Sequence, residues 1–191
     1  MLRIAMVSVI VCLVSATAPV GAREGVGATL SFNGAEFHHR WSQNGQHEFT
    51  PKGDEDLKKF KDMMTINVFD GVKDGEALAQ IANGVLANYQ KNGHIMRTLS
   101  KPRTEDSEAE HFIAAVLQAP NVWEVAFARV LMFEGRGIVA VYSKRFYGEG
   151  DEPKDAMMEW FKANAVKIEK VLVSWQGIPS RDVLNKLPVS R

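Results

Sequence analysis

The sequence has almost no cysteine, because Cys12 is the only one among 191 residues. A single cysteine cannot form a disulfide within its own chain or build a thiolate zinc site. Cys12 also lies inside an apolar run and is followed by more apolar residues, which argues against lipid attachment there. If residues 1–22 are removed, no cysteine is left, and the fold must be held together by its hydrophobic core.

An excess of charge of one sign is also absent. The chain has 23 basic and 23 acidic residues and a formal net charge of zero. This balance gives no electrostatic reason to expect binding to nucleic acid or to an anionic membrane surface. After residue 22, no apolar run approaches the about 20 residues that are needed to span a bilayer. We therefore expect neither nucleic acid as a partner nor a membrane span in the mature chain.

The common catalytic motifs are missing as well. The chain contains no Gly-x-Ser-x-Gly, no His-Glu-x-x-His and no glycine-rich phosphate loop. These absences favour a non-catalytic binding or interaction domain that needs no cofactor. Its expected partner is an unknown protein or a small anionic molecule. Two alternatives stay open: a small periplasmic hydrolase, or an immunity-type partner of a secreted effector.

The first 22 residues have the three-part layout of a secretory signal peptide. Arg3 supplies the positive start, Ile4–Val14 is apolar, and small or polar residues follow as far as Ala22. The sequence Val20-Gly21-Ala22 fits a cleavage site before Arg23. We therefore predict a periplasmic or secreted protein, and the lack of cysteine favours the bacterial periplasm.

The rest of the chain reads as one α+β domain over residues 23–177, followed by a loose C-terminal tail over residues 178–191. Helical spacing of apolar residues predicts long helices over 75–92, capped by Asp74 and stopped by Gly93, and over 154–175. A short helix is expected over 54–64. Alternation and turn residues predict strands over 28–33, 36–42, 46–50, 65–69, 94–101, 109–119, 122–133 and 138–147.

The last two strands are apolar on both faces. If Phe133 pairs with Ile138, one face carries Val125, Phe127, Leu131, Phe133, Ile138, Ala140, Tyr142 and Phe146. The other face carries Ala126, Ala128, Val130, Met132, Val139 and Val141. A sheet that is apolar on both faces must be covered on both. The expected fold is therefore an antiparallel sheet with helices on both faces, an α/β/α sandwich.

The hairpin around Asn44-Gly45 has two possible registers. A two-residue loop pairs Trp41 with Glu48, whereas a three-residue loop pairs Arg40 with Glu48 and His39 with Phe49. We favour the three-residue loop, because it separates polar from apolar side chains on the two faces.

The order of these elements resembles the Mog1/PsbP-like fold. The residues that carry the resemblance are the hairpin end Glu48-Phe49-Thr50-Pro51, the helix Gly75–Asn92 and the aromatic strand Ile138–Tyr147. Members of that fold are mostly non-catalytic binding or assembly proteins, so the resemblance implies a function of that kind. It transfers no functional residue, because no family motif is present.

Two cations and a tyrosine in the last two strands form the predicted ligand site. With Phe133 opposite Ile138, Arg129 lies opposite Tyr142, and Lys144 is its diagonal neighbour on the same face. Such a group could hold a carboxylate or a phosphate. The alternative is that these cations pair with Glu152, Asp155 or Glu159 and have a structural role.

Histidines and acidic residues supply weaker candidates. His39 and His47 could share a face of the hairpin, but without a firm third ligand they make a poor metal site, and we expect no metal. Glu108, Glu110 and His111 resemble an acid/base set for a hydrolase. Glu110 and His111 are neighbours on a strand, however, and so face in opposite directions.

Overall fold

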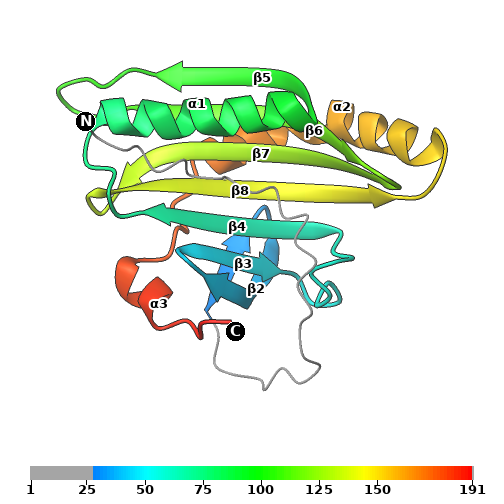
Figure 1. Ribbon diagram of the computed structural model, residues 1–191, viewed down its shortest axis with the longest axis horizontal. Coiled ribbons are helices and arrows are strands. Elements are labelled where there is room, and N and C mark those ends of the chain that lie inside the picture. Colours follow the sequence, from blue (N-terminus) through cyan, green and yellow to red (C-terminus); the bar gives the residue numbers. More distant parts are fainter. Residues whose placement is uncertain (1–27, 191) are drawn as a thin grey trace.

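The computed structural model describes residues 28–190, so the predicted signal peptide and its cleavage site lie outside the described residues. Figure 1 shows the elements in chain order. The strands are β1 (Thr29–Phe32), β2 (Ala35–Gln43), β3 (Gln46–Thr50), β4 (Asp62–Phe69), β5 (Gly93–Lys101), β6 (Glu110–Ala119), β7 (Val122–Phe133) and β8 (Arg136–Tyr147). The helices are α1 (Gly75–Asn92), α2 (Glu152–Val173) and α3 (Arg181–Asn185).

The eight strands form one antiparallel sheet in the order β1-β2-β3-β4-β8-β7-β6-β5. The long meander β5–β8 supplies one half, and β4 pairs with β8 to attach the N-terminal strands as the other half. The predicted α+β class and the antiparallel sheet are confirmed. Within residues 28–190, no helix has both the length and the apolar character that crossing a bilayer requires.

The turn between β7 and β8 is shorter than the sequence led us to expect. Glu134 and Gly135 form a two-residue turn, with φ angles of 50° and 69°. Positive φ at both central residues is the geometry that suits a tight hairpin. Phe133 therefore pairs with Arg136, and Ile138 pairs with Leu131 rather than with Phe133. The predicted register is wrong by two residues, although the predicted faces are right because the side-chain period of a strand is also two.

Two hydrophobic clusters divide the buried side chains of the meander. In β6, Phe112 and Ala114 belong to the cluster that contains Leu172 of α2. Ile113 and Ala115 belong to the other cluster, which is built on α1. Alternate residues of one strand thus pack in different clusters, as the period of two requires. The predicted apolar stripe of the last helix is confirmed by the burial of Met157, Ile168 and Leu172.

The predicted bounds of helix α1 are confirmed, and so is its cap: the Asp74 side chain accepts a hydrogen bond of 2.8 Å from the backbone N–H of Ala77.

The helix predicted over 54–64 is wrong. There the Asp54 carboxylate accepts the backbone N–H groups of Lys61 and Asp62, at 3.1 and 3.0 Å. These donors lie seven and eight residues further on, so Asp54 closes a loop instead of capping a helix, and β4 begins at Asp62.

The hairpin of β2 and β3 combines the two expected registers. His39 pairs with Phe49, as in the favoured register, but Trp41 pairs with Glu48, as in the other. A β-bulge at Arg40 makes both pairings possible, because it leaves an extra residue on one strand. The Arg40 side chain donates to the Thr50 hydroxyl at 3.0 Å.

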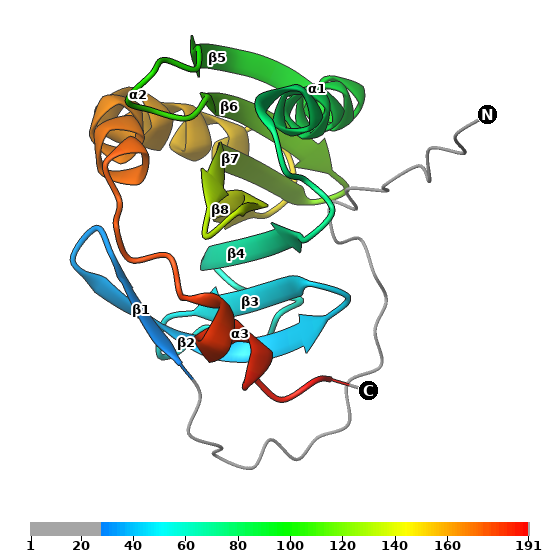
Figure 2. The same cartoon turned by 90° about the vertical axis from the view of Figure 1, so that its left-hand side faces the viewer.

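The C-terminal segment, residues 178–190, is packed, so the prediction of a loose tail is wrong. It contains α3, whose N-cap Ser180 accepts a hydrogen bond from the backbone N–H of Val183. Leu184 and Leu187 are buried in the same cluster as α2. The backbone N–H of Ser190 donates to the carbonyl of Ser42 at 2.8 Å. Figures 1 and 2 show this segment, in red, beside β2 and β3.

Candidate functional site

The predicted anion site around Arg129 is not formed. Arg129 pairs with Ala140 rather than with Tyr142. Its Nε and Nη2 donate to the two oxygens of Glu110 at 3.1 and 3.2 Å. Its Nη1 donates to the carbonyls of Leu172 and Trp175, at 3.1 and 2.7 Å. The guanidinium therefore joins β6 and β7 to the C-terminal end of α2, which is a structural role.

Tyr142 and Lys144 share a different carboxylate. The Tyr142 hydroxyl donates to Asp62 Oδ1 at 2.6 Å, and Lys144 Nζ lies 3.2 and 3.0 Å from the two Asp62 oxygens. Burial is the main cause that raises the pKa of Tyr142 above its ordinary value, so the hydroxyl stays protonated and donates. The expected partners on α2 are not used. The sequence did not reveal Asp62, because it was assigned to a helix that does not form.

His39 and His47 come together, but a serine stands between them. The Ser42 hydroxyl lies 2.7 Å from His39 Nε2 and 2.8 Å from His47 Nδ1. Burial lowers the pKa of both rings, that of His47 to about 4, with further lowering by the charges of His39 and Arg136. Among residues 28–190, no group of three His, Cys, Asp or Glu side chains is placed to hold a metal ion.

The acid/base set does not converge. Glu110 is occupied by Arg129, whereas His111 Nδ1 lies 3.0 Å from the Ser100 hydroxyl. Glu108 pairs with Arg103 at 3.6 Å, and both side chains are exposed. The three candidate residues therefore have three separate sets of partners.

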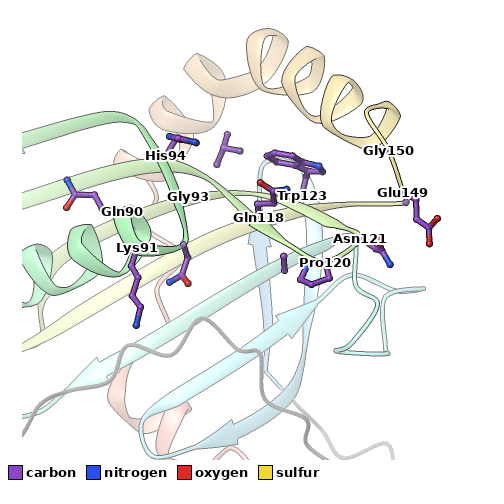
Figure 3. A pocket seen from close by; sticks show the side chains of 14 residues that line it. Gln90, Lys91, Gly93, His94, Gln118, Pro120, Asn121, Trp123, Glu149 and Gly150 are labelled. Carbon is purple, nitrogen blue, oxygen red and sulfur yellow. The ribbon is translucent and has the colours of Figure 1, made fainter.

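An open groove of about 730 Å³ lies at the end of the sheet where α1 passes into β5. This end groove is bounded by three pieces of chain: the end of α1 with the start of β5, the β6–β7 turn, and the loop before α2 (Figure 3). It was not found by sequence reasoning, because its parts are distant in the chain and share no motif. Its lining residues are Gln90, Lys91, Asn92, Gly93, His94, Val116, Gln118, Ala119, Pro120, Asn121, Trp123, Gly148, Glu149 and Gly150.

Two backbone positions at this end of the sheet restrict which residue can stand there. A Cβ at Gly93 would overlap the carbonyl oxygen of Val116, so glycine is required where the helix turns directly into the edge strand. Asn121 has a φ of 60°, which is the left-handed conformation that asparagine tolerates better than most residues.

Three side chains give the end groove its chemistry. His94, Gln118 and Trp123 lie on the side of the groove nearest α2 (Figure 3). Their backbones are paired in the sheet, but no side chain of the three makes a hydrogen bond within residues 28–190, so the side-chain polar atoms are available to a ligand. The Trp123 ring has Lys154 Nζ 6.0 Å from its centroid, which holds a cation against this indole. The groove thus offers an aromatic surface beside uncommitted hydrogen-bonding groups.

A second groove of about 550 Å³ lies between β5 and the C-terminal half of α2. It is lined by Leu99, Lys101, Glu169, Lys170, Val173 and Ser174. An ion pair of 2.6 Å between Arg97 and Glu169 adjoins it. It has no aromatic side chain, and two of its three charged residues, Lys101 and Lys170, are exposed.

Comparison with known proteins gives a family match and distant structural likenesses. A protein-family model matches residues 24–173. No curated protein matches the chain. Twelve chains of known structure match, among them the crystal structure of human STARD10, which is 9% identical over 73% of this chain and 74% of that chain. Its TM-score is 0.29, which is too low to assign a ligand or an activity.

Proposed function

The chain belongs to the family whose model matches residues 24–173, and we propose that it is an exported, non-catalytic domain that binds a small polar ligand in the end groove. The observation that carries this proposal is the indole of Trp123 beside the unpaired polar side chains of His94 and Gln118. A volume of about 730 Å³ lies within the range of small-molecule sites. The groove is open, so a ligand can enter without movement of the fold.

The lining chemistry favours a hydroxyl-rich ligand, a saccharide. The amide side chains of Gln90, Gln118 and Asn121 can each donate and accept hydrogen bonds, which is what hydroxyl groups require. Trp123 provides a flat apolar surface with one N–H donor at its edge. The charged side chains that line the groove, Lys91 and Glu149, are opposite in sign, so the groove does not select a strongly charged ligand.

Export is part of the same proposal. It is supported by the three-part N-terminus and by the start of the family match at residue 24, one residue after the predicted cleavage position. The resemblance to the Mog1/PsbP-like fold also stays a proposal, and it agrees with a binding role.

We further infer that the meander is the middle layer of an α/β/α sandwich. The support is the division of β6 and β7 between a cluster with α1 and a cluster with α2, and the positions of these helices on either side of the strands in Figure 2. Because the two helices occupy the faces, a ligand can reach the meander mainly at its ends and edges. The end groove is such a place.

The alternative of a hydrolase gains no support from Glu110 and His111, because their partners hold them apart. The alternative of an immunity-type protein predicts a stable complex with a secreted effector. Capture of one protein in a fixed ratio, with no saccharide binding, would favour that alternative.

The proposal is tested by titrating the protein with glucose, N-acetylglucosamine and cellobiose while tryptophan fluorescence is recorded. We expect at least one of these probes to give a saturable change, and Trp123→Ala to weaken binding at least about tenfold, as loss of a central aromatic contact does. Gln118→Ala should weaken it less. Trp41→Phe is the matched control, because Trp41 lies on β2, far along the sheet. No saturable change with any probe, or equal binding by Trp123→Ala, would reject the proposal.

A further inference from the structure

Arg136, the first residue of β8, is a buried cation at the other end of the meander. Only 1% of the residue is exposed, and it is among the largest fully buried side chains. A guanidinium does not lose its proton in proteins, so this charge is present in the folded state. An unpaired buried charge costs several kcal/mol, and a position of this kind therefore calls for a partner.

Residues 28–190 supply no acceptor for one edge of this guanidinium. Among the described residues, neither Nε nor Nη2 of Arg136 has a hydrogen-bond partner. The nearest carboxylate oxygen, Glu134 Oε2, is 3.7 Å from Nη2, which is too far for a hydrogen bond. That oxygen accepts the backbone N–H of Arg181 at 2.8 Å, so it is held by another donor.

The contacts of Arg129 show which group the Nε–Nη2 edge of an arginine binds in this protein. Its Nε and Nη2 donate in parallel to the two oxygens of Glu110. Two parallel N–H groups match the geometry of a carboxylate or a phosphate. The same two atoms of Arg136 form an equivalent fork that no side chain of residues 28–190 fills.

The electrostatic surroundings favour an anion there. Burial is the main cause that lowers the pKa of Arg136, and the charge of Arg181 lowers it further, whereas Asp70 and Glu134 raise it. The charge of Arg136 also acts on His47 and lowers its pKa. Arg136 and Arg181 repel each other, and an anion bound at Arg136 would reduce this repulsion.

The C-terminal segment brings a second cation, Arg181, close enough for its charge to act on Arg136. Arg181 pairs with Asp70 at 3.0 Å through side chains that are 45% and 73% exposed. An exposed ion pair contributes little to stability, so this anchor can open at small cost. The charges of both residues act on Arg136: Asp70 follows β4, and Arg181 begins α3.

We propose that the Nε–Nη2 edge of Arg136 binds a small oxyanion, a carboxylate or a phosphate, next to the C-terminal segment. The site is separate from the end groove, so either proposal can fail without the other. Arg136 binds and orients the anion through two N–H groups, and Arg181 adds positive charge without a direct role in the fork.

The first test compares melting temperatures in sodium phosphate, acetate and chloride at equal ionic strength and pH. A ligand that binds only the folded state raises the melting temperature in a saturable way. For the wild-type protein we expect a rise of several degrees with phosphate or acetate up to about 100 mM, and the anion that gives the larger rise identifies the preferred class. Chloride should give a smaller rise.

Arg136→Met should remove this anion-dependent rise, and Arg136→Lys, which keeps the charge without the fork, should reduce it. Arg97→Met is the matched control, because Arg97 forms an exposed ion pair on β5, and it should respond like the wild type. If the variants do not fold, the wild-type protein is titrated instead, and the nuclear magnetic resonance signal of the Arg136 Nε–H is followed to test anion binding. A saturable shift on addition of phosphate or acetate supports the site. No shift, or an equal rise in Arg136→Met, overturns it.

Discussion

Arg129 and Glu110 form a two-pronged ion pair across β7 and β6, with N–O distances of 3.1 and 3.2 Å. The Arg129 side chain is only 7% exposed and that of Glu110 is 17% exposed. The same guanidinium donates to two carbonyls at the end of α2. This residue pair therefore connects the sheet to the helix at the point where the helix terminates.

We predict that Arg129→Met lowers the free energy of unfolding by about 3–5 kcal/mol, because it leaves Glu110 buried without its main partner. Lys101 Nζ is 3.9 Å from Glu110 and half exposed, so it does not replace the guanidinium. The measurement is urea unfolding at pH 7.

The double variant Arg129→Met with Glu110→Met is the control, because it removes both charges. It should recover part of the loss, since an apolar pair of similar size avoids the unpaired carboxylate. A single variant within about 1 kcal/mol of the wild type would show that the ion pair is not important for stability.

The face assignments of the meander could be predicted although its register could not. Hydrophobic patterning identified Phe127 and Tyr142 as one face and Ala126 and Val139 as the other, and the two clusters agree. The turn length depends on whether Glu134 adopts a positive φ, which a glutamate rarely does. Hydrophobic patterning does not reveal such a backbone angle. The predicted cross-strand partner of Arg129 was therefore wrong, although its predicted face of the sheet was right.

The partners of the polar residues were harder to predict than the core. Asp54 looked like a helix cap, but its hydrogen bonds reach Lys61 and Asp62 across a loop. Because no helix forms there, Asp62 is the first residue of β4 and pairs with Lys144 on the neighbouring strand β8. Local sequence contains no information on such long-range pairs, and the end groove, which is made of distant segments, was missed for the same reason.

The C-terminal segment gives a second prediction, with a matched pair inside α3. Leu184 is 2% exposed and Val183 is 40% exposed, although they are neighbours. Leu184→Ala should cost about 2–5 kcal/mol of unfolding free energy, because it leaves a cavity in the main cluster. Val183→Ala should change it by less than about 0.5 kcal/mol. Equal, small effects of both substitutions in thermal or urea unfolding would show that the segment is not part of the folded core.

His47 gives a third prediction, on the pH dependence of stability. Its pKa is lowered from 6.5 to about 4 in the folded protein, mainly by burial. Between these values the unfolded chain binds a proton that the folded protein does not, so stability falls as the pH falls from about 7 to about 4. Below about 4 the folded protein is protonated too, and this group causes no further loss.

The variant His47→Asn isolates this effect. Asparagine keeps an acceptor near Nδ1 for the Ser42 hydroxyl but cannot bind a proton in this range. The loss of unfolding free energy between pH 7 and pH 4.5 should be smaller in the variant, by about 2 kcal/mol after allowance for partial solvation of the ring. His39 and His111 contribute to the slope in both proteins, so the difference between the two reports on His47. Parallel curves for the two proteins would contradict the assignment.

The fourth prediction concerns the proposed signal peptide and its cleavage. Val20-Gly21-Ala22 fits the small-residue pattern of a cleavage site, and the family match begins just after it, at residue 24. Intact-mass measurement of protein recovered from the periplasm or medium should therefore give a chain that begins at Arg23. Because Cys12 is the only cysteine, that chain can form no disulfide, and its melting temperature should be the same with and without a reductant.

The variant Ala22→Leu, which removes the small residue before the cut, should slow processing and leave a precursor that retains residues 1–22. A soluble exported protein that still begins at Met1, or a melting temperature that falls in reductant, would show that these residues are not a cleaved signal peptide.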